Sequence, residues 1–277
     1  MCLLVLAWAS HPRYPLIVAA NRDEFHDRPA ASLGYWPEPP HILAGRDLRA
    51  GGTWLGLDAS RRFGIVTNYR DLQRPAPGAP SRGELIPGFL AQPRGAGEFL
   101  AALAPQAERY SGFNLLLHDG RELWYGSNRA VPFARPLPPG IYGLSNHLLD
   151  TPWPKLERVR RAFSAAVRGA APDADAAPSE DATPSTDATP STDALLAILA
   201  DRMPAAAGEP LPQTGLPPEW ERVLSSPFVL NPQYGTRCST VVLCDAAGAL
   251  RVRERRFDAA GALSGETEVA LEPGAWP

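Results

Sequence analysis

The 277-residue sequence has little that would direct it to a membrane, a nucleic acid or an oxidising compartment. No apolar run approaches the ~18 residues of a membrane-spanning helix. The apolar run at residues 2–9 also lacks the preceding basic residues of a signal peptide. A formal net charge of −3 offers no basic excess for nucleic acid or an anionic membrane surface. Three cysteines do not form a disulfide framework. We therefore expect a cytoplasmic protein with no nucleic-acid partner and no membrane insertion.

Motifs that bind common cofactors and metals are absent too. The sequence contains no G-x-G-x-x-G, no Walker A motif and no C-x-x-C-H haem-attachment motif. Its five histidines are scattered, without H-x-x-x-H or H-E-x-x-H spacing. Cys238 and Cys244 lie six residues apart on an expected strand, so both point to one face, where core packing is favoured over zinc binding. We expect no metal and no cofactor.

The overall composition is that of an ordinary globular protein, with 44% hydrophobic and 21% charged residues. A chain of this length is near the upper limit that one hydrophobic core fills, so we expect a single domain over residues 1–277. Residues 171–191 form an exception. They are low in complexity, with DATPST repeated twice from residue 181 to residue 192. Such a segment cannot offset its chain entropy, and we expect a disordered insertion there.

Hydrophobic patterning predicts strands and helices in alternating groups. Ser81 and Glu84 stand at the spacing of a capping box, and Leu156, Val159 and Phe163 share one face of another expected helix. The order of strands, helices, strands, helices and strands favours an α+β fold with mainly antiparallel sheets over a Rossmann fold. Strands are expected at 2–9, 16–21, 53–58, 63–68, 113–118, 122–125, 141–145, 239–245, 250–257 and 267–271, and helices at 82–90, 97–103, 151–167 and 193–203.

Cys2 is a candidate nucleophile because of its position. Residue 2 is small, so removal of Met1 would leave Cys2 with a free α-amine, whose ordinary pKa is about 7.7–8.0. A neutral fraction of this amine can take the thiol proton, so one residue supplies both nucleophile and base. The alternative is that Cys2 is only a small buried apolar residue at the start of a strand.

The first expected hairpin brings polar residues to Cys2. If residues 10–15 form its loop, Ala9 lies opposite Leu16 and Cys2 lies opposite Asp23. A slip of one or two residues still leaves residues 21–24 beside the N-terminus, with opposed residues about 5 Å apart. Asp23 would then accept a hydrogen bond from the α-amine, and Arg22 would offset the carboxylates or favour a thiolate. The alternative is a polar strand end that turns into solvent.

Several ordered motifs carry a family resemblance over nearly the whole chain. They are Met1-Cys2, Ala20-Asn21-Arg22-Asp23-Glu24-Phe25 with Arg28-Pro29, Gly51-Gly52-Thr53-Trp54-Leu55-Gly56, Thr67-Asn68-Tyr69 with Arg82-Gly83-Glu84-Leu85, Tyr142-Gly143-Leu144-Ser145-Asn146 with Thr151-Pro152-Trp153, and Tyr234-Gly235-Thr236-Arg237. Together they resemble the NRDE family, also called the transport-and-Golgi-organisation type 2 family. The low-complexity residues 171–191 depart from it.

That family is similar to N-terminal-nucleophile hydrolases of the penicillin V acylase and bile-salt hydrolase kind. The resemblance implies a four-layer αββα sandwich and a catalytic cleft. Cys2 matches the nucleophile, and Asn68 and Asn146 resemble the two oxyanion asparagines. The remaining matches are Arg22, Asp23 and Arg237, of which Arg22 is the weakest because the local order differs from the acylase pattern. As alternatives, the asparagines are turn or strand-end residues, and Arg237 forms an ion pair.

Two hypotheses of function follow from the resemblance. The first is a Cys2-dependent amidase or acyltransferase-like hydrolase of a small amide or acyl substrate, with asparagine N–H groups holding the oxyanion. The second is a ligand-binding or trafficking protein on the same scaffold, because NRDE members are linked to handling of haem, of lipid or acyl-CoA, and to Golgi organisation. A retained Met1 would count against the enzyme.

Overall fold

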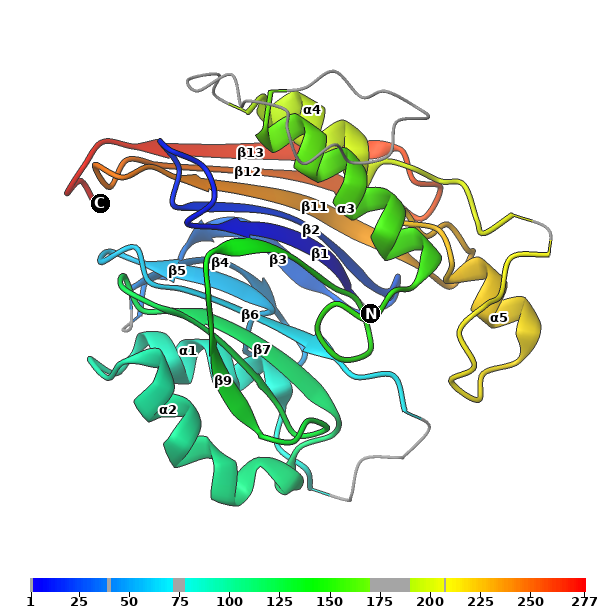
Figure 1. Cartoon of the computed structure of the whole chain (residues 1–277), viewed down its shortest axis with the longest axis horizontal. Coiled ribbons are helices and arrows are strands. Elements are labelled where there is room, and N and C mark those ends of the chain that lie inside the picture. Colours follow the sequence, from blue (N-terminus) through cyan, green and yellow to red (C-terminus); the bar gives the residue numbers. More distant parts are fainter. Residues whose placement is uncertain (1, 39–40, 72–77, 170–189, 207) are drawn as a thin grey trace.

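Two antiparallel β-sheets form the centre of the molecule (Figure 1). The computed structural model describes residues 2–38, 41–71, 78–169, 190–206 and 208–277. The six-stranded sheet has the order β10-β1-β2-β11-β12-β13, and the seven-stranded sheet runs from β3 to β9 in sequence order. All pairings between these described strands are antiparallel. The expected α+β class with mainly antiparallel sheets is therefore confirmed.

The six-stranded sheet joins the two ends of the described chain. Its strands are β1 (Cys2–Trp8), β2 (Leu16–Phe25), β10 (Gly140–Leu144), β11 (Tyr234–Cys244), β12 (Leu250–Phe257) and β13 (Leu263–Leu271). The seven-stranded sheet comprises β3 (Ala30–Tyr35), β4 (Ile42–Asp47), β5 (Leu55–Asp58), β6 (Phe63–Asn68), β7 (Phe113–His118), β8 (Leu123–Ser127) and β9 (Ala134–Leu137).

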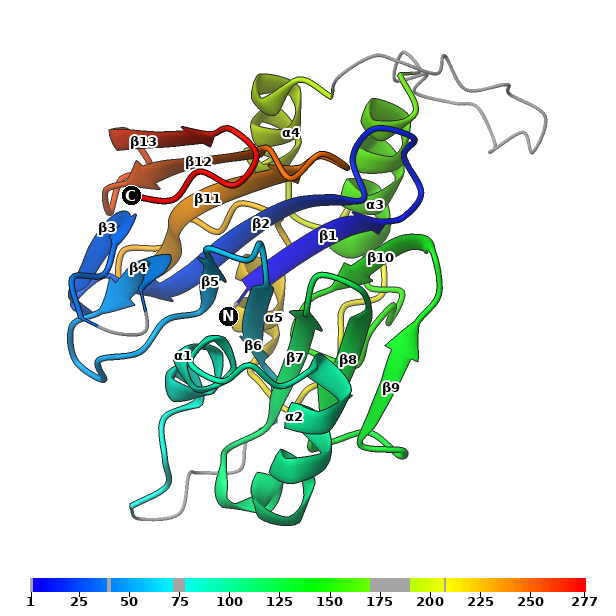
Figure 2. The same ribbon diagram turned by 90° about the vertical axis from the view of Figure 1, so that its left-hand side faces the viewer.

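Helices cover the outer face of each sheet (Figure 2). On the six-stranded sheet these are α3 (Pro154–Val167) and α4 (Thr192–Leu199), and on the seven-stranded sheet α1 (Leu85–Leu90) and α2 (Ala96–Leu103). The chain is thus layered as helices, sheet, sheet and helices. The short α5 (Pro218–Val223) lies at the end of the six-stranded sheet (Figure 1), and the 3₁₀ turns are η1 (Arg82–Glu84) and η2 (Ala104–Arg109).

Burial on both faces explains the continuous apolar sequence of β1. Successive side chains of a strand point to opposite faces. Leu4 and Leu6 therefore pack between the two sheets, whereas Leu3 and Val5 pack against α3 and α4. A strand covered on both faces has no polar side to present to water, so its sequence shows no alternation.

Most expected elements occur close to their predicted ends. The strands at 63–68, 113–118 and 250–257 coincide with β6, β7 and β12, while β2 continues four residues beyond its expected end to Phe25. The helix expected at 82–90 starts as the 3₁₀ turn η1. There, Ser81 Oγ accepts from the Gly83 N–H, and the Glu84 carboxylate accepts from Tyr110 instead of returning to the cap. The reciprocal half of the predicted capping box is therefore not formed.

The register of the first hairpin differs by one residue from the prediction. Ala9 has φ of +45° and leaves the strand, and its N–H donates to the Pro15 carbonyl at 2.8 Å. Trp8, not Ala9, thus pairs with Leu16, and Cys2 pairs with Arg22 rather than with Asp23. A slip of one residue moves a side chain to the other face of the sheet. Cys2 and Arg22 accordingly share the inner face, and Asp23 lies on the face covered by helices.

Five elements were not predicted, namely β3, β4, β9, α5 and the 3₁₀ turn η2. The expected disordered insertion at 171–191 falls outside the described residues except for its last two positions. Among the helices that the structure describes, none has the length and apolar character that crossing a membrane requires.

Candidate functional site

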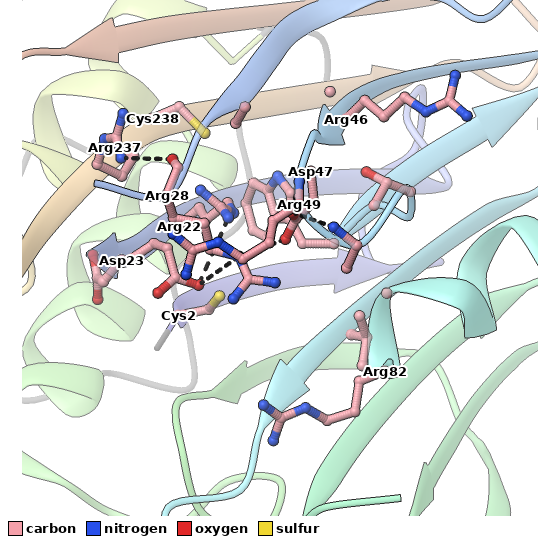
Figure 3. Close-up of a pocket in the computed structure, with 18 of the residues that line it drawn as sticks. Cys2, Arg22, Asp23, Arg28, Arg46, Asp47, Arg49, Arg82, Arg237 and Cys238 are labelled. Carbon is pink, nitrogen blue, oxygen red and sulfur yellow. Dashed lines mark hydrogen bonds and ion pairs between the residues drawn. The ribbon is translucent and has the colours of Figure 1, made fainter. Parts of the chain in front are cut away.

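A cavity of about 590 Å³ opens between the two sheets at the end where β1 begins and β2 ends. Both sheets contribute to its walls, and the turn before α1 closes it from below (Figure 3). The charged residues that line it are seven arginines and four acidic residues, namely Arg22, Arg28, Arg46, Arg49, Arg82, Arg237, Arg256, Asp23, Glu24, Asp47 and Glu254. Arginine is therefore in excess, and the cavity favours an anionic or electron-rich group.

Cys2 lines this cavity in a row with Arg22 and Cys238. The three residues are paired neighbours on β1, β2 and β11. Two strand spacings place the cysteines about 10 Å apart, beyond the ~7 Å between Cα atoms that a disulfide tolerates. Burial raises the pKa of the Cys2 thiol, while the positive charges of the amino terminus and of Arg22 lower it. Burial also raises the pKa of Cys238 well above its usual value. Arg22 lowers the pKa of Cys238 as well, so the added positive charge of the amino terminus is what distinguishes Cys2.

A chain of ion pairs orders the arginines beside Cys2. Arg28 Nε lies 2.7 Å from Asp47 Oδ2 and 3.8 Å from Glu24 Oε2. Arg22 Nη2 lies 3.7 Å from the same Glu24 oxygen. The alternation of charges ties the end of β2 to the end of β4, so the two sheets are linked across the cavity. Arg22 is held beside the thiol with only 11% of its side chain exposed.

Arg82 faces Cys2 from the opposite wall. Its Nη1 donates to the Gly112 carbonyl at 2.9 Å, and no carboxylate of the described residues lies within ion-pair distance of it. Burial lowers the pKa of Arg82 from its ordinary value, and the nearby Cys2 and Glu24 oppose that effect. The Arg82 guanidinium is therefore a cation with spare donors at the floor of the cavity.

The position of Arg82 depends on close contact between two glycines. The Thr53 N–H donates to the Gly83 carbonyl at 2.9 Å, and a Cβ placed on Gly52 would lie 2.3 Å from that same oxygen. A backbone approach this tight accepts no side chain. Gly52 thus fixes the turn that carries Arg82.

Replacing Gly52 tests this contact. Gly52→Ala should destabilise the protein by about 1–3 kcal/mol, because the added carbon forces the backbone of the turn to move. Gly88→Ala is the matched control: it lies within α1, nothing lies within 4 Å of its added Cβ, and it should stabilise by up to about 1 kcal/mol. Urea unfolding of both variants measures the difference. Equal stabilities would show that the turn tolerates displacement.

Asn68 and Asn146 lie together at the end of β6 but face different surroundings. Asn68 lines the cavity, and its side-chain amide has no hydrogen-bond partner within the described segments. Asn146 is fully buried, and its Nδ2 donates to the Asn68 carbonyl at 3.0 Å. The Asn68 amide is thus available to an oxyanion in the cavity, whereas Asn146 fixes the backbone that presents it.

Arg237 borders the cavity, but its contacts are with the chain itself. It occupies a bulge in β11, and its Nη1 donates to the carbonyls of Phe25, His26 and Arg28 at 2.9–3.3 Å. Within the described residues Arg237 forms no ion pair, and its hydrogen-bond partners are backbone oxygens. Arg237 holds the loop that follows β2.

Asp23 borders the cavity, but its register places its carboxylate on the helix-covered side of the sheet. Its carboxylate points away from the other labelled side chains in Figure 3, and its Oδ1 accepts from Thr236 Oγ1 at 2.7 Å. Burial raises the pKa of Asp23, while Lys155, the amino terminus and the Thr236 hydroxyl lower it. Asp23 thus joins a buried polar cluster on the helix-covered side of the sheet.

The buried polar cluster comprises Asp23, Lys155 and the ion pair of Arg70 with Glu221. Arg70 Nη1 lies 2.7 Å from Glu221 Oε2, and each side chain is only 5% exposed. Arg70 also stacks on the Trp153 ring at 4.8 Å. The cluster joins the strand ends beside Cys2 to α3 and α5.

Sequence reasoning missed Lys155 and Glu254. Lys155 stands four residues before Val159 and eight before Phe163, so it occupies the apolar stripe of α3, and this spacing was a usable signal. Glu254 is buried in the cavity wall and accepts from the Leu33 N–H. Nothing in its sequence context distinguishes it from the neighbouring charged residues of β12. Within the described residues, no group of three metal-ligating side chains occurs.

The fold and site define a class of protein: two facing antiparallel sheets, covered by helices, with an N-terminal-strand cysteine in an arginine-rich cavity. The sequence matches the family described as Transport and Golgi organisation 2 over residues 1–259. It is 34% identical to the mouse Transport and Golgi organization 2 homolog over 270 residues, and 33% identical to the human Transport and Golgi organization protein 2 homolog over 275 residues. Each alignment covers 92% of both chains. The chain belongs to the Transport and Golgi organisation 2 family.

Proposed function

We propose that this protein is a hydrolase or acyltransferase of small amide or acyl substrates, with Cys2 as an N-terminal nucleophile. The observation that carries the proposal is the placement of Cys2 at the start of β1, where it faces the cavity with Arg22 beside it. The succession of helices, sheet, sheet and helices supports assignment to the N-terminal-nucleophile type.

The proposed reaction uses groups from this chain at each step. After Met1 is removed, the α-amine of Cys2 takes the thiol proton, and the thiolate attacks the substrate carbonyl. The Asn68 amide donates to the resulting oxyanion. The ammonium returns the proton to the leaving amine or thiol as the bond to carbon breaks, which leaves an acyl thioester on Cys2. Water, deprotonated by the same amine, then releases the acid and regenerates the thiol.

The role of Asn68 gives a measurable consequence. Asn68→Ala should lower kcat about 10²–10³-fold with little change in KM, because an oxyanion donor acts mainly in the transition state. Steady-state kinetics on any substrate found for the protein measures the two constants separately. A change confined to KM would mean that Asn68 only binds substrate.

Trapping an acyl-enzyme tests the proposal itself. The protein is mixed with a panel of acyl anilides, esters and acyl thioesters, quenched in acid and weighed intact. A transient added mass of one acyl group, located on Cys2 by peptide mapping, is the expected result. Absence of any adduct or turnover across the panel would contradict the proposal.

One observation favours the alternative of a binding protein for haem or an acyl-CoA-like ligand. Burial raises the pKa of Cys2, so a thiol without the adjacent free amine stays protonated and unreactive at neutral pH. The excess of arginine in the cavity suits a carboxylate- or phosphate-bearing ligand equally well in either role. If the panel gives no adduct, titration with haem and with an acyl-CoA becomes the decisive comparison.

A further inference from the structure

The chain contains a single lysine, Lys155, and the fold buries it. Lys155 lies in the first turn of α3, and only 2% of its surface is exposed. Its Nζ has no hydrogen-bond partner in the part of the chain that the structure describes. A buried ammonium is costly and persists where nearby charges compensate it. The Lys155 ammonium therefore depends on a negative charge nearby.

The charges that surround Lys155 single out Asp23. The groups that act on it are Asp23, Arg70, Cys2 and Glu221. Arg70 Nη1 and Glu221 Oε2 are 2.7 Å apart, so the opposite charges of these two side chains largely cancel. Burial lowers the pKa of Lys155 to about 8, and Asp23 gives the largest opposing effect. Burial raises the pKa of Asp23, and among the groups that oppose this, Lys155 comes first, ahead of the amino terminus, Thr236 and Arg70.

The position of Asp23 links this pair to the nucleophile. Arg22 pairs with Cys2 across the first hairpin, so the backbone nitrogen of Cys2 lies beside the peptide that joins Arg22 to Asp23. The Thr236 hydroxyl fixes the carboxylate at 2.7 Å. A buried carboxylate without a cationic neighbour takes up a proton, and it then no longer attracts an ammonium group.

We propose that Lys155 is a positioning residue of the Cys2 site: from the helix-covered side of the sheet it keeps Asp23 ionised, and ionised Asp23 holds the amino group of Cys2. The catalytic consequence of this inference rests on the proposed function, in which the amine of Cys2 acts as the base. The ionised carboxylate orients the amine and strengthens it as a base toward the thiol. Lys155 itself touches neither substrate nor thiol.

The single lysine allows a direct first test on the whole protein. Lysine labelled with ¹³C at Cε gives one NMR signal, whose midpoint against pH reports Lys155 alone. The midpoint should lie near 8 in the wild type. It should fall by about one pH unit or more in Asp23→Asn, because the main stabilising charge is lost. Glu268→Gln, at an exposed position of β13, should leave it unchanged. An unchanged midpoint in Asp23→Asn would overturn the proposal.

The second test follows the amino group at position 2 without relying on catalysis. In a Cys2→Ala background the small residue permits removal of Met1, which intact mass verifies. Competitive acetylation across a pH series then gives the pKa of the amino group. Adding Lys155→Met should lower this pKa by about one pH unit, as Asp23 becomes neutral, and Lys155→Arg should preserve it.

The pKa of the amino group behaves differently if the ionisation of Asp23 does not depend on Lys155. If Asp23 stays ionised without Lys155, removal of a nearby positive charge raises the pKa of the amino group, and a rise or no change overturns the proposal. Both tests are independent of whether Cys2 is a nucleophile, so their failure is distinguishable from failure of the proposed function. If Lys155→Met does not fold, the lysine titration of the wild type and Asp23→Asn still decides.

Discussion

Cys2→Ala is expected to abolish turnover of an amide or acyl substrate while the protein stays folded. The thiol is the only group of the protein that forms a bond to the substrate carbon in the proposed reaction, so its loss should lower kcat/KM by about 10⁴-fold or more. The side chain is small and lies at the edge of the core, so truncation leaves little empty volume. Kinetics and thermal unfolding of the same preparation measure both parts of the expectation.

Cys244→Ala provides the matched control for that variant. Cys244 is also a buried cysteine on the inner face of the six-stranded sheet, but it lies at the other end of β11 and does not border the cavity. Its loss should leave kcat/KM within a few-fold of the wild type. Equal activity of Cys2→Ala and Cys244→Ala would remove Cys2 from the chemistry.

Glu221→Ala is expected to destabilise the protein by about 3–5 kcal/mol. The substitution removes the carboxylate that lies 2.7 Å from the buried Arg70 guanidinium, in a cluster that already contains the Lys155 ammonium. It also removes the acceptor of the Thr214 N–H, which donates to Glu221 Oε1 at 3.0 Å. Chemical denaturation at neutral pH gives the free energy of unfolding.

Glu268→Ala is the comparison for an exposed ion pair. Glu268 of β13 lies 3.6 Å from Arg251 of β12, and 44% of the Glu268 side chain is exposed. Solvent screens such a pair, so its loss should cost about 1 kcal/mol or less. If Glu221→Ala were no more damaging than Glu268→Ala, the buried cluster would not hold α5 against the strand ends.

The sequence predicts the interior strands well because their patterns are unambiguous. The bounds expected for β6 and β7 match the structure, since each is an apolar run between polar residues. The strands it missed lie at or near the edges of the seven-stranded sheet. β9, with the sequence Ala-Arg-Pro-Leu, has no apolar alternation, and its proline is tolerated because an edge strand leaves N–H groups unpaired.

The site was predicted in part, and the errors have a common physical origin. Five of the six expected residues border the cavity, because the strand ends that carry them meet there. The side of the sheet on which Asp23 lies could not be predicted, since it depends on one residue of register that the positive φ of Ala9 sets. Contacts such as that of Arg237 with three carbonyls depend on a loop conformation that no local pattern encodes.

The central claim, that Cys2 is an N-terminal nucleophile, is tested most directly by the intact mass of the purified protein before and after iodoacetamide at neutral pH. The account predicts a mass lacking Met1, and fast addition of one carbamidomethyl group on Cys2, while Cys238 and Cys244, which are buried like Cys2 but have no α-amine to take the thiol proton, stay unlabelled until the protein is unfolded. A retained Met1, with Cys2 as unreactive in the native protein as the other two cysteines, would contradict it.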